Sequence, residues 1–243
     1  MIFDWGIVWQ YLFAPPIIVG ALVTLQLSIL AEAIGVVLGC LMALGRRARN
    51  PFLFAPARFY IWFFRGTPVY VQLIFWFTLL PALSPFNVAL LALSLNEGAY
   101  MAEIVRAGIE SVDRGQVEAA QSLGMVSSLT MRRIVLPQAL RVIIPPTGNE
   151  FISMLKTSSL ASYISVAELL QSGQNIYTSA GATPGAGHIL ELLVVVSLYY
   201  LLLTSIFSVG QQWLENRLGD RRATLTAWSW RAMLPWRIAG RSL

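Results

Sequence analysis

The sequence predicts an all-α integral membrane protein with about five transmembrane helices. Hydrophobic residues make up 56% of its 243 residues and charged residues only 12%, which differs strongly from the composition of soluble globular domains. The hydrophobic residues gather in runs of roughly 20 or more, the length that a helix needs to cross the hydrocarbon core of a bilayer. The basic residues lie in clusters between these runs. Little of the chain is left for a soluble domain.

The first predicted span covers residues 17–44. Its only ionisable residue is Glu32, and it ends just before the basic cluster Arg46, Arg47 and Arg49. The composition therefore indicates one membrane crossing that is followed by a basic cluster.

The second predicted span, residues 59–80, is interrupted by Arg65, Gly66, Thr67 and Pro68. Proline has no backbone N–H and disfavours helical geometry in the residue before it. We therefore expect a broken or kinked helix at this point.

The third predicted span, residues 86–109, is followed by a polar stretch at residues 110–141. The fourth is expected to start after Pro145 and Pro146, because proline is favoured in the first turn of a helix, and to run to about residue 167.

The fifth span is expected from residue 188 to about residue 214. The preceding loop, residues 168–187, is rich in Gly, Ser, Thr and Ala and has room for a short helix before the glycine-rich stretch at residues 181–187. We divide the chain into a transmembrane domain, residues 1–217, and a tail, residues 218–243. The composition of the tail suits either the headgroup region of the inner leaflet or a disordered basic segment.

The distribution of basic residues predicts the orientation in the membrane. Residues 1–45, 66–105 and 157–216 contain no Lys or Arg. With five spans, the remaining basic residues fall on one side, apart from Lys156 and Arg65 at membrane depth. Because Lys and Arg accumulate in cytoplasmic loops, we expect the N-terminus outside and the C-terminus in the cytoplasm.

Several functional classes are disfavoured by the sequence. The net charge of +5 is explained better by topology than by a nucleic acid partner. Cys40 is the only cysteine, so neither an intrachain disulfide nor a cysteine-rich metal site is possible, and no metal site is predicted. The single lysine, Lys156, follows Leu155, so the chain has no phosphate-binding P-loop. Asp4 and the lack of a basic N-terminal region argue against a cleaved signal peptide.

The polar stretch at residues 118–140 reads EAAQSLGMVSSLTMRRIVLPQAL. It predicts two short helices with a corner at Gly124, where glycine permits a tight turn. Ser127 and Ser128 are candidate N-caps of the second helix, which Pro137 is expected to end or bend.

This stretch resembles the EAA loop of binding-protein-dependent ABC importer permeases, with the family's spacing throughout. The matching residues are Glu118, Ala119, Ala120, Gly124, Ile134, Leu136 and Pro137. Three further stretches resemble the polar amino acid branch of that family: residues 64–73 (FRGTPVYVQL), 98–109 (GAYMAEIVRAGI) and 149–160 (NEFISMLKTSSL). The resemblance extends over roughly residues 17–215.

The resemblance implies a permease of the MetI-like type, with a cytoplasmic coupling loop at about residues 110–144. The seven matching residues would contact a separate ATPase subunit. Two such ATPases would bind ATP and Mg²⁺, so this chain needs no cofactor of its own and has no catalytic residues. The other implied partners are a second permease copy or a sister permease, a periplasmic or extracellular solute-binding protein, an amino acid and the lipid of a bacterial cytoplasmic (inner) membrane.

Polar residues at membrane depth indicate a substrate pathway. An ionisable group costs about 2.5 to 3.5 kcal/mol at the centre of a membrane helix, so it usually faces a cavity or a partner. The ammonium of an amino acid could bind a carboxylate such as Glu150, and its carboxylate could lie near helix N-termini or hydroxyls such as Thr67. The candidate pathway residues are Arg65, Thr67, Asn96, Glu97, Tyr100, Glu103, Asn149, Glu150, Lys156, Thr157 and Ser158.

For any one of these residues the alternative is an internal ion pair, a Glu with Lys156 or Arg65, that only orients helices. The predicted function is import of polar amino acids, with basic amino acids and opine-like derivatives as candidates. The alternative is an ion-coupled secondary transporter or channel in which Glu97, Glu103 and Glu150 bind the proton or cation. An enzyme is disfavoured, because the Ser-x-x-Lys spacing of Ser153 and Lys156 lacks companion motifs.

Overall fold

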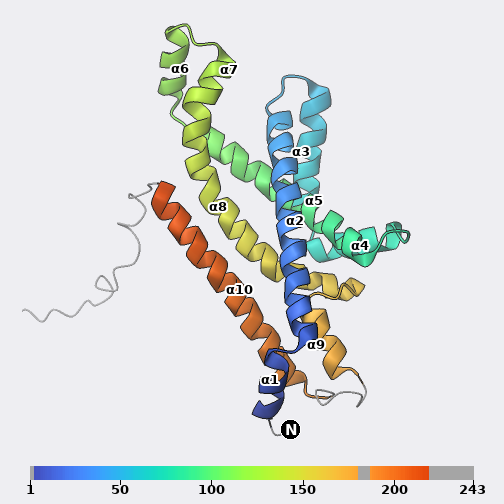
Figure 1. Cartoon of the computed structure of the whole chain (residues 1–243). Coiled ribbons are helices and arrows are strands. Elements are labelled where there is room, and N and C mark those ends of the chain that lie inside the picture. The colour runs from blue at the N-terminus through green and yellow to red at the C-terminus, as the bar shows by residue number, and fades with distance from the viewer. Residues whose placement is uncertain (1–2, 180–186, 219–243) are drawn as a thin grey trace, which may run out of the picture.

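The computed structural model describes residues 3–179 and 187–218, and every regular element in these ranges is helical. Figure 1 shows the helices running roughly along one long axis, with the hairpin of α6 and α7 at one end and α1 and α9 at the other. A π-helix, η1 (Met131–Val135), and a 3₁₀-helix, η2 (Ser158–Ile164), flank α8. The α-helices are α1 (Trp5–Leu12), α2 (Pro15–Arg46), α3 (Pro51–Gly66), α4 (Val69–Leu79), α5 (Pro85–Glu110), α6 (Arg114–Ser122), α7 (Ser127–Thr130), α8 (Leu136–Thr157), α9 (Leu169–Tyr177) and α10 (Ile189–Leu218).

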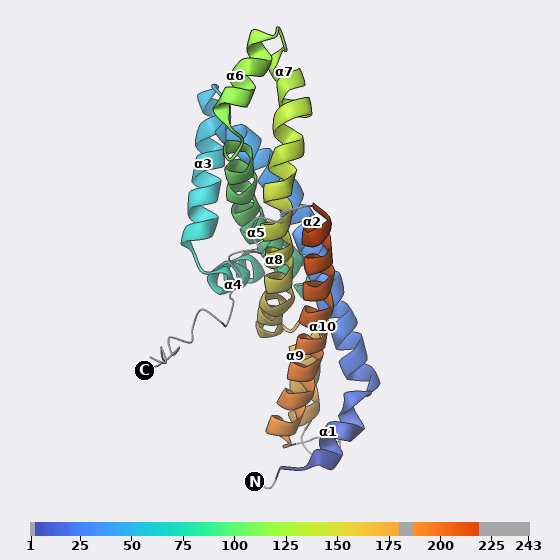
Figure 2. The same cartoon turned by 90° about the vertical axis from the view of Figure 1, so that its left-hand side faces the viewer.

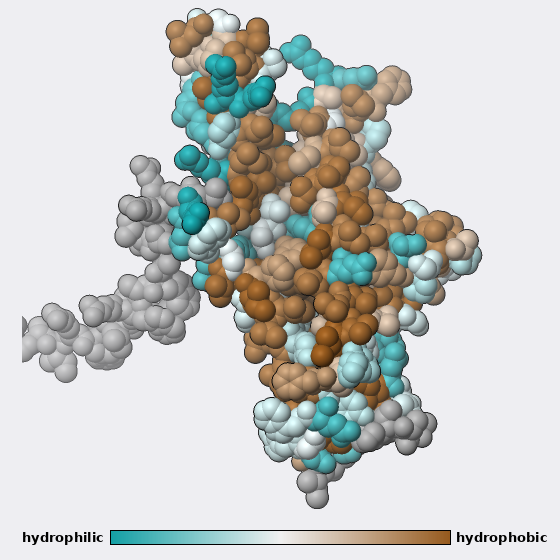
Figure 3. Space-filling model, viewed as in Figure 1, coloured by the Kyte–Doolittle hydropathy of each residue, from teal (hydrophilic) through white to brown (hydrophobic). Residues whose placement is uncertain are grey.

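Three of these helices, α2, α5 and α10, are long and apolar enough to cross a membrane. They correspond to the first, third and fifth predicted spans. The other two predicted spans fall short of that combination of length and apolarity, because α3 and α4 are separate pieces and α8 carries polar residues. Figure 3 shows hydrophobic side chains over the middle of the molecule and hydrophilic ones at both ends.

The α2 and α5 helices form the most closely packed pair. A Cβ atom added at Gly35 would lie 2.6 Å from Glu97 Cγ, and one added at Gly39 would lie 2.4 Å from Met101 Cβ. Small residues allow two membrane helices to approach this closely. Small residues recur every four positions on α2 and are buried against the rest of the chain: Ala31, Gly35, Gly39 and Ala43. Figure 2 shows α3 beside α5, with α2 passing behind α5.

The second predicted span is broken where the sequence indicated. The α3 helix, N-capped by Asn50, ends at Gly66, and α4 begins at Val69 after Thr67 and Pro68 in extended geometry. Figure 1 shows α4 leaving the axis of the bundle at the side. The expected kink is thus a complete change of direction.

The prediction that Pro145 and Pro146 open the fourth helix is wrong. Both lie inside α8, which ends at Thr157 and is followed by η2 rather than continuing to residue 167. Tertiary packing holds the helix through the prolines: α8 lies against α5 and α10, and the side chain of Gln211 donates to the carbonyl of Pro145 (3.0 Å). A proline pair in sequence does not reveal this support.

The prediction for the polar loop is correct for its corner and for the presence of a second helix, and wrong for the N-cap and the end of that helix. The cap of α7 is Val126, and no side chain caps it, so Ser127 is already helical. Pro137 does not end the helix, because the chain passes through η1 and continues as α8. A π-turn changes the hydrogen-bond register, and the N–H of Leu136 bonds to the carbonyl of Met131.

At the opposite end, a buried carboxylate joins three helices. Glu168 is fully buried and caps α9 by accepting from the N–H groups of Leu170 (3.0 Å) and Gln171 (2.8 Å). It also accepts from the hydroxyls of Tyr200 on α10 (2.8 Å) and Thr24 on α2 (3.4 Å). The carboxylate thereby fixes α9, the short helix for which the loop had room.

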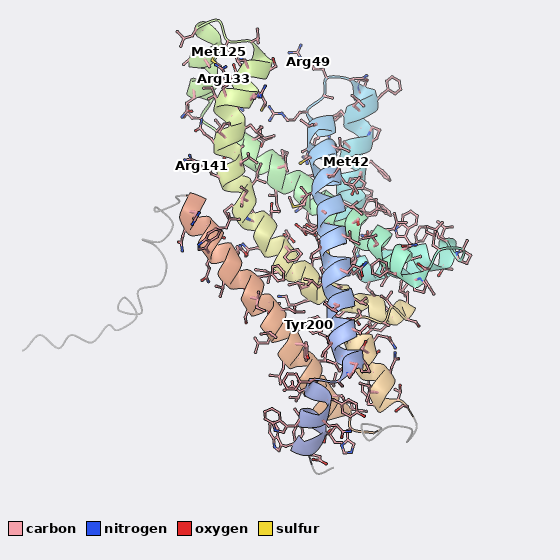
Figure 4. All side chains as sticks on the ribbon, in the orientation of Figure 1. Met42, Arg49, Met125, Arg133, Arg141 and Tyr200 are labelled. Carbon is pink, nitrogen blue, oxygen red and sulfur yellow. The ribbon has the colours of Figure 1, made fainter. Side chains whose placement is uncertain are left out.

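Two predicted features lie outside the described residues, and one helix of the structure was not predicted. The glycine-rich stretch falls mostly in residues 180–186, and nearly all of the predicted tail falls in residues 219–243. The α1 helix was not predicted; it packs beside α10, where the hydroxyl of Tyr199 donates to the carbonyl of Leu12 (2.6 Å). Figure 4 shows Tyr200 towards the α1 end, whereas Arg49, Arg133 and Arg141 lie towards the hairpin.

We predict that Tyr200→Phe lowers the free energy of unfolding by about 1.5 to 3 kcal/mol, the usual value for a hydrogen bond to a charged group. Thermal unfolding in detergent measures this loss. Tyr163→Phe is the matched control, since Tyr163 is 65% exposed. Equal stability of the two variants would contradict a structural role for the Tyr200–Glu168 bond.

Candidate functional site

A cavity of about 250 Å³ lies between α4, α5 and α8; we call it the central cavity. Two helical faces form most of its wall. Both contribute residues at positions i, i+3, i+4 and i+7, the spacing of one face of an α-helix. The lining residues are Val69 from α4; Leu93, Asn96, Glu97 and Tyr100 from α5; and Glu150, Ser153, Met154 and Thr157 from α8.

The break between α3 and α4 fixes the polar side of this cavity. Pro68 has no N–H, so the carbonyl of Phe64 loses its helical partner. The side-chain amides of Asn96 and Gln72 each donate to that carbonyl at 3.0 Å. Gln72 also donates to the carbonyl (3.0 Å) and hydroxyl (2.8 Å) of Thr67. Two amides thus replace the hydrogen bonds that the break removes.

The carboxylates at the cavity form no ion pair with a Lys or Arg side chain of the described residues. Glu97 is 5% exposed, and its Oε1 has no hydrogen-bond partner. Glu150 is half-buried, and neither residue forms an ion pair within the described part of the chain. Glu32 on α2 lies close enough to interact with both charges. Several carboxyl groups gathered inside a membrane protein can together bind a cationic ligand.

Arg65 and Thr67 lie near the cavity but do not line it. The Arg65 guanidinium stacks over the Tyr100 ring, 5.3 Å from the ring centroid. It is near enough to Glu150 for the two charges to interact, although they form no ion pair. The Thr67 hydroxyl donates to the carbonyl of Phe63 (2.9 Å). The cavity is therefore bordered by the side chain of one arginine on its α3 side.

Four predicted pathway residues do not reach the cavity. Glu103 forms ion pairs with Arg46 and Arg106 at one end of α5. The expected internal pair thus exists, but with other partners than Lys156 or Arg65. Three residues of the fourth span lie outside the lining: Asn149 and Lys156, which are exposed, and Ser158, which is buried and donates to the carbonyl of Leu155.

Two residues of this region were not among the sequence-based candidates. Glu32 is 7% exposed, and neither of its carboxylate oxygens has a partner in the described structure. Its position as the only ionisable residue in an apolar span was the available signal. Gln72 could not be recognised, because its role depends on the geometry of the break at Pro68. Among the residues that the structure describes, no three His, Cys, Asp or Glu side chains are arranged to hold a metal ion.

The second candidate site is the hairpin of α6 and α7, which we call the coupling hairpin (residues 110–144). The side chain of Asp113 caps α6, and Gly124 terminates it at φ +81°. The N–H of Met125 bonds to the carbonyl of Ala120 (3.1 Å), as in a Schellman ending. Side-chain rotation cannot relieve a positive φ, so glycine is favoured at position 124.

The residues that match the EAA motif divide into exposed and buried ones. Ala120 is 6% exposed, and Ile134 is half-buried. Their neighbours Val112, Val135 and Ala139 belong to an apolar cluster that fastens the hairpin to α5 and α2. The exposed motif residues are Glu118, Ala119, Gly124, Leu136 and Pro137. Leu123 and Val126 are also exposed, at 85% and 65%, so the tip presents an apolar surface.

Comparisons with known proteins agree on one family. A family model described as "Binding-protein-dependent transport system inner membrane component" matches residues 35–220. The chain is 45% identical to the arginine transport system permease protein of Corynebacterium glutamicum, over 93% of this chain and 75% of the relative. It is 36% identical to the glutamine transport system permease protein of Escherichia coli, over 90% of this chain and 99% of the relative.

Solved structures give the same fold. A chain from the "crystal structure of an amino acid ABC transporter with histidines" is 37% identical, with a TM-score of 0.81 over 89% of this chain and 100% of that one. A chain of the MetNI methionine ABC transporter in an inward-facing conformation is 18% identical, with a TM-score of 0.67. The second match shows the fold alone, and it bears out the MetI-like fold class.

We predict that Asn96→Ala lowers the free energy of unfolding by about 1 kcal/mol, the usual net contribution of a neutral hydrogen bond. The carbonyl of Phe64 then keeps Gln72 as its only side-chain donor. Thermal unfolding in detergent is the measurement, and Asn87→Ala, at an exposed position of the same helix, is the control. A loss no larger than that of the control would mean that Asn96 does not support the break.

Proposed function

The chain belongs to the family of binding-protein-dependent transport system inner membrane components, and we propose that it carries polar amino acids with a cationic group. Members of this family are the permease subunits of ABC importers in the inner membrane, which work with ATPase and solute-binding protein partners. The main sequence-based interpretation, an amino acid importer permease, is therefore correct. The cargo, the stoichiometry and the mechanism proposed below go further.

One observation carries the choice of cargo. Glu97 and Glu150 line the central cavity without a cation bound to either of them in the described structure. An ammonium or guanidinium group can donate several hydrogen bonds to such carboxylates, and burial strengthens each of them. The cationic end of the cargo binds at Glu150 and Glu97.

The carboxylate of the cargo binds at the α4 side of the cavity. Val69, the first residue of α4, belongs to the lining, and α4 has no side-chain cap. The first N–H groups of a helix lack intrahelical partners and favour a negative charge. Arg65 adds a positive charge on the same side. A zwitterion with a second cationic group thus has complementary partners at both ends of the cavity.

The names of the relatives support this class of cargo. They are permeases for arginine, cystine and glutamine, all of them polar amino acids. A cationic cargo is the choice that uses the unpaired carboxylates. Family membership also favours an ATP-driven importer over an ion-coupled transporter, in which the same glutamates would bind the coupling ion.

The coupling hairpin contacts a partner ATPase through the exposed motif residues and the apolar tip. Two ATPases bind ATP and Mg²⁺ and act on two permeases, this chain with a second copy or a sister permease. ATP binding reorients the helices and opens the cavity to one side at a time, and hydrolysis resets them. In this arrangement the N-terminus lies outside and the hairpin lies in the cytoplasm, as the clusters of arginine suggest.

We predict that Glu150→Gln reduces uptake of cationic amino acids by roughly tenfold to a hundredfold, because a hydrogen bond to a charged group contributes about 1.5 to 3 kcal/mol. Uptake of neutral amino acids should fall much less. Transport of radiolabelled arginine and glutamine into proteoliposomes that contain the whole complex measures both.

The control for this experiment is Asp4→Asn, which removes an exposed carboxylate at the start of α1, outside both the cavity and the hairpin. It should change neither uptake. If Glu150→Gln lowered the uptake of both amino acids equally, the carboxylate would be structural and the assignment of a cationic cargo would be wrong.

We also predict that Gly124→Val lowers substrate-stimulated ATP hydrolysis by at least tenfold and leaves membrane insertion intact. A left-handed conformation costs a residue with a Cβ atom about 1 to 2 kcal/mol. The corner of the hairpin would therefore change shape. ATPase activity of the purified complex is the measurement.

Ser128→Val is the matched control, because it places the same side chain at an exposed helical position of the same hairpin. Unchanged coupling in Gly124→Val, with normal assembly, would count against a coupling role for this corner.

A further inference from the structure

A second and larger hollow, of about 480 Å³, lies between α8 and α10; we call it the α8/α10 groove. Its walls are mainly apolar, and Phe151 and Phe207 form an edge-to-face pair across it, with ring centroids 4.7 Å apart. The side chain of α10 is missing at Gly210, which belongs to the lining and leaves space open. A Cβ atom added at Gly210 would meet nothing within 4 Å.

The groove also contains acceptors that lack donors. Glu32 belongs to its lining, and neither carboxylate oxygen has a hydrogen-bond partner in the described part of the chain. The same holds for Oε1 of Gln211. Glu215 accepts from Gln211 (2.9 Å) but forms no ion pair among the described residues. Buried acceptors are normally satisfied, so an occupant with several N–H donors and an apolar body would complete this groove.

The described part of α10 ends next to the groove. Glu215 is the last residue of α10 that lines the groove, and α10 ends three residues later at Leu218. The sequence goes on for another 25 residues, 219–243. Groove residues 206–215 lie within roughly 20 Å of the end of α10, at 1.5 Å per residue. An extended segment of this length reaches about 80 Å, so residues 219–243 can return to any part of the groove.

The composition of residues 219–243 complements the groove. The segment contains five Arg, one Asp and three Trp, and it lies mostly beyond the family match, which ends at residue 220. Its core reads WSWR at residues 228–231. Tryptophan contributes a large apolar surface and one N–H donor, and arginine contributes five donors and a positive charge. The tryptophans would supply apolar surface for the walls of the groove. The N–H groups would supply donors for Glu32 and Glu215.

We propose that residues 219–243 fold back along α10 and place the WSWR segment, residues 228–231, in the α8/α10 groove. One or both tryptophans of this segment pack between the two helices, beside Phe151 and Phe207, and arginine binds Glu215 or Glu32. The docked segment spans α8 and α10 and holds them at a fixed distance. The inference depends on the groove and the sequence and is independent of the cargo of the transporter.

Cross-linking of two introduced cysteines with a bismaleimide tests the proposal. In full-length chain assembled with its partners and carrying Cys40→Ala, Ser229→Cys is combined with Gly210→Cys in the groove. The matched control combines Ser229→Cys with Val209→Cys, since Val209 is the neighbouring residue, is 66% exposed and lies outside the groove lining. A short bismaleimide should link the Gly210 pair at least ten times faster than the Val209 pair, with the linked peptides identified by mass spectrometry.

Three outcomes would overturn the proposal. Equal rates for the two pairs would show that the segment does not reside in the groove. Links between two chains would show that a second copy covers it. Absence of a link, together with quenching of the tail tryptophans by brominated phospholipids in nanodiscs, would place the segment in the membrane surface. As a second supporting measurement, Glu215→Arg should slow the Gly210 link at least threefold, because it reverses the charge at the rim.

Discussion

A carbonyl group that loses its donor inside a membrane must find another one, and this constraint organises the region around the central cavity. An unpaired backbone group in the hydrocarbon core costs several kcal/mol. Pro68 creates such a carbonyl at Phe64, and the amides of Asn96 and Gln72 satisfy it. Since Asn96 belongs to α5 and Gln72 to α4, the repair holds both helices at the break. The N-terminus of α4 and the polar face of α5 are thereby brought to the same cavity.

The α8 helix connects the two candidate sites. It begins after the π-helix of the coupling hairpin and ends with Glu150, Ser153 and Thr157 at the central cavity. Its 22 residues span roughly 33 Å at 1.5 Å per residue. A displacement of the hairpin can therefore be transmitted to the cavity through α8 as one continuous helix. At the far end Glu168 fastens α9 to α2 and α10, so the α9 end is held by hydrogen bonds and the hairpin end by apolar packing.

The sequence was sufficient for the features that depend on composition and local chemistry. The all-helical membrane fold, the break at Pro68, the corner at Gly124 and the family were predictable, as were five residues of the cavity: Asn96, Glu97, Tyr100, Glu150 and Thr157. The features that it did not reveal depend on distant partners. Pro145 lies within a helix because neighbouring helices support it, Gln72 matters because of the carbonyl of Phe64, and Glu103 is occupied because two arginines reach it.

The close contact of α2 with α5 has a consequence for how such permeases diverge. Gly35 lies directly against Glu97, and Gly39 against Met101, so there is no space in which the α5 wall of the cavity could be rebuilt. A larger side chain on either helix would separate the pair and disturb the fold. The α8 wall has no such restriction, since Ser153 is exposed and Thr157 only half-buried. A change in the shape of the cavity is therefore achieved more easily by substitutions on α8 than by substitutions on α5.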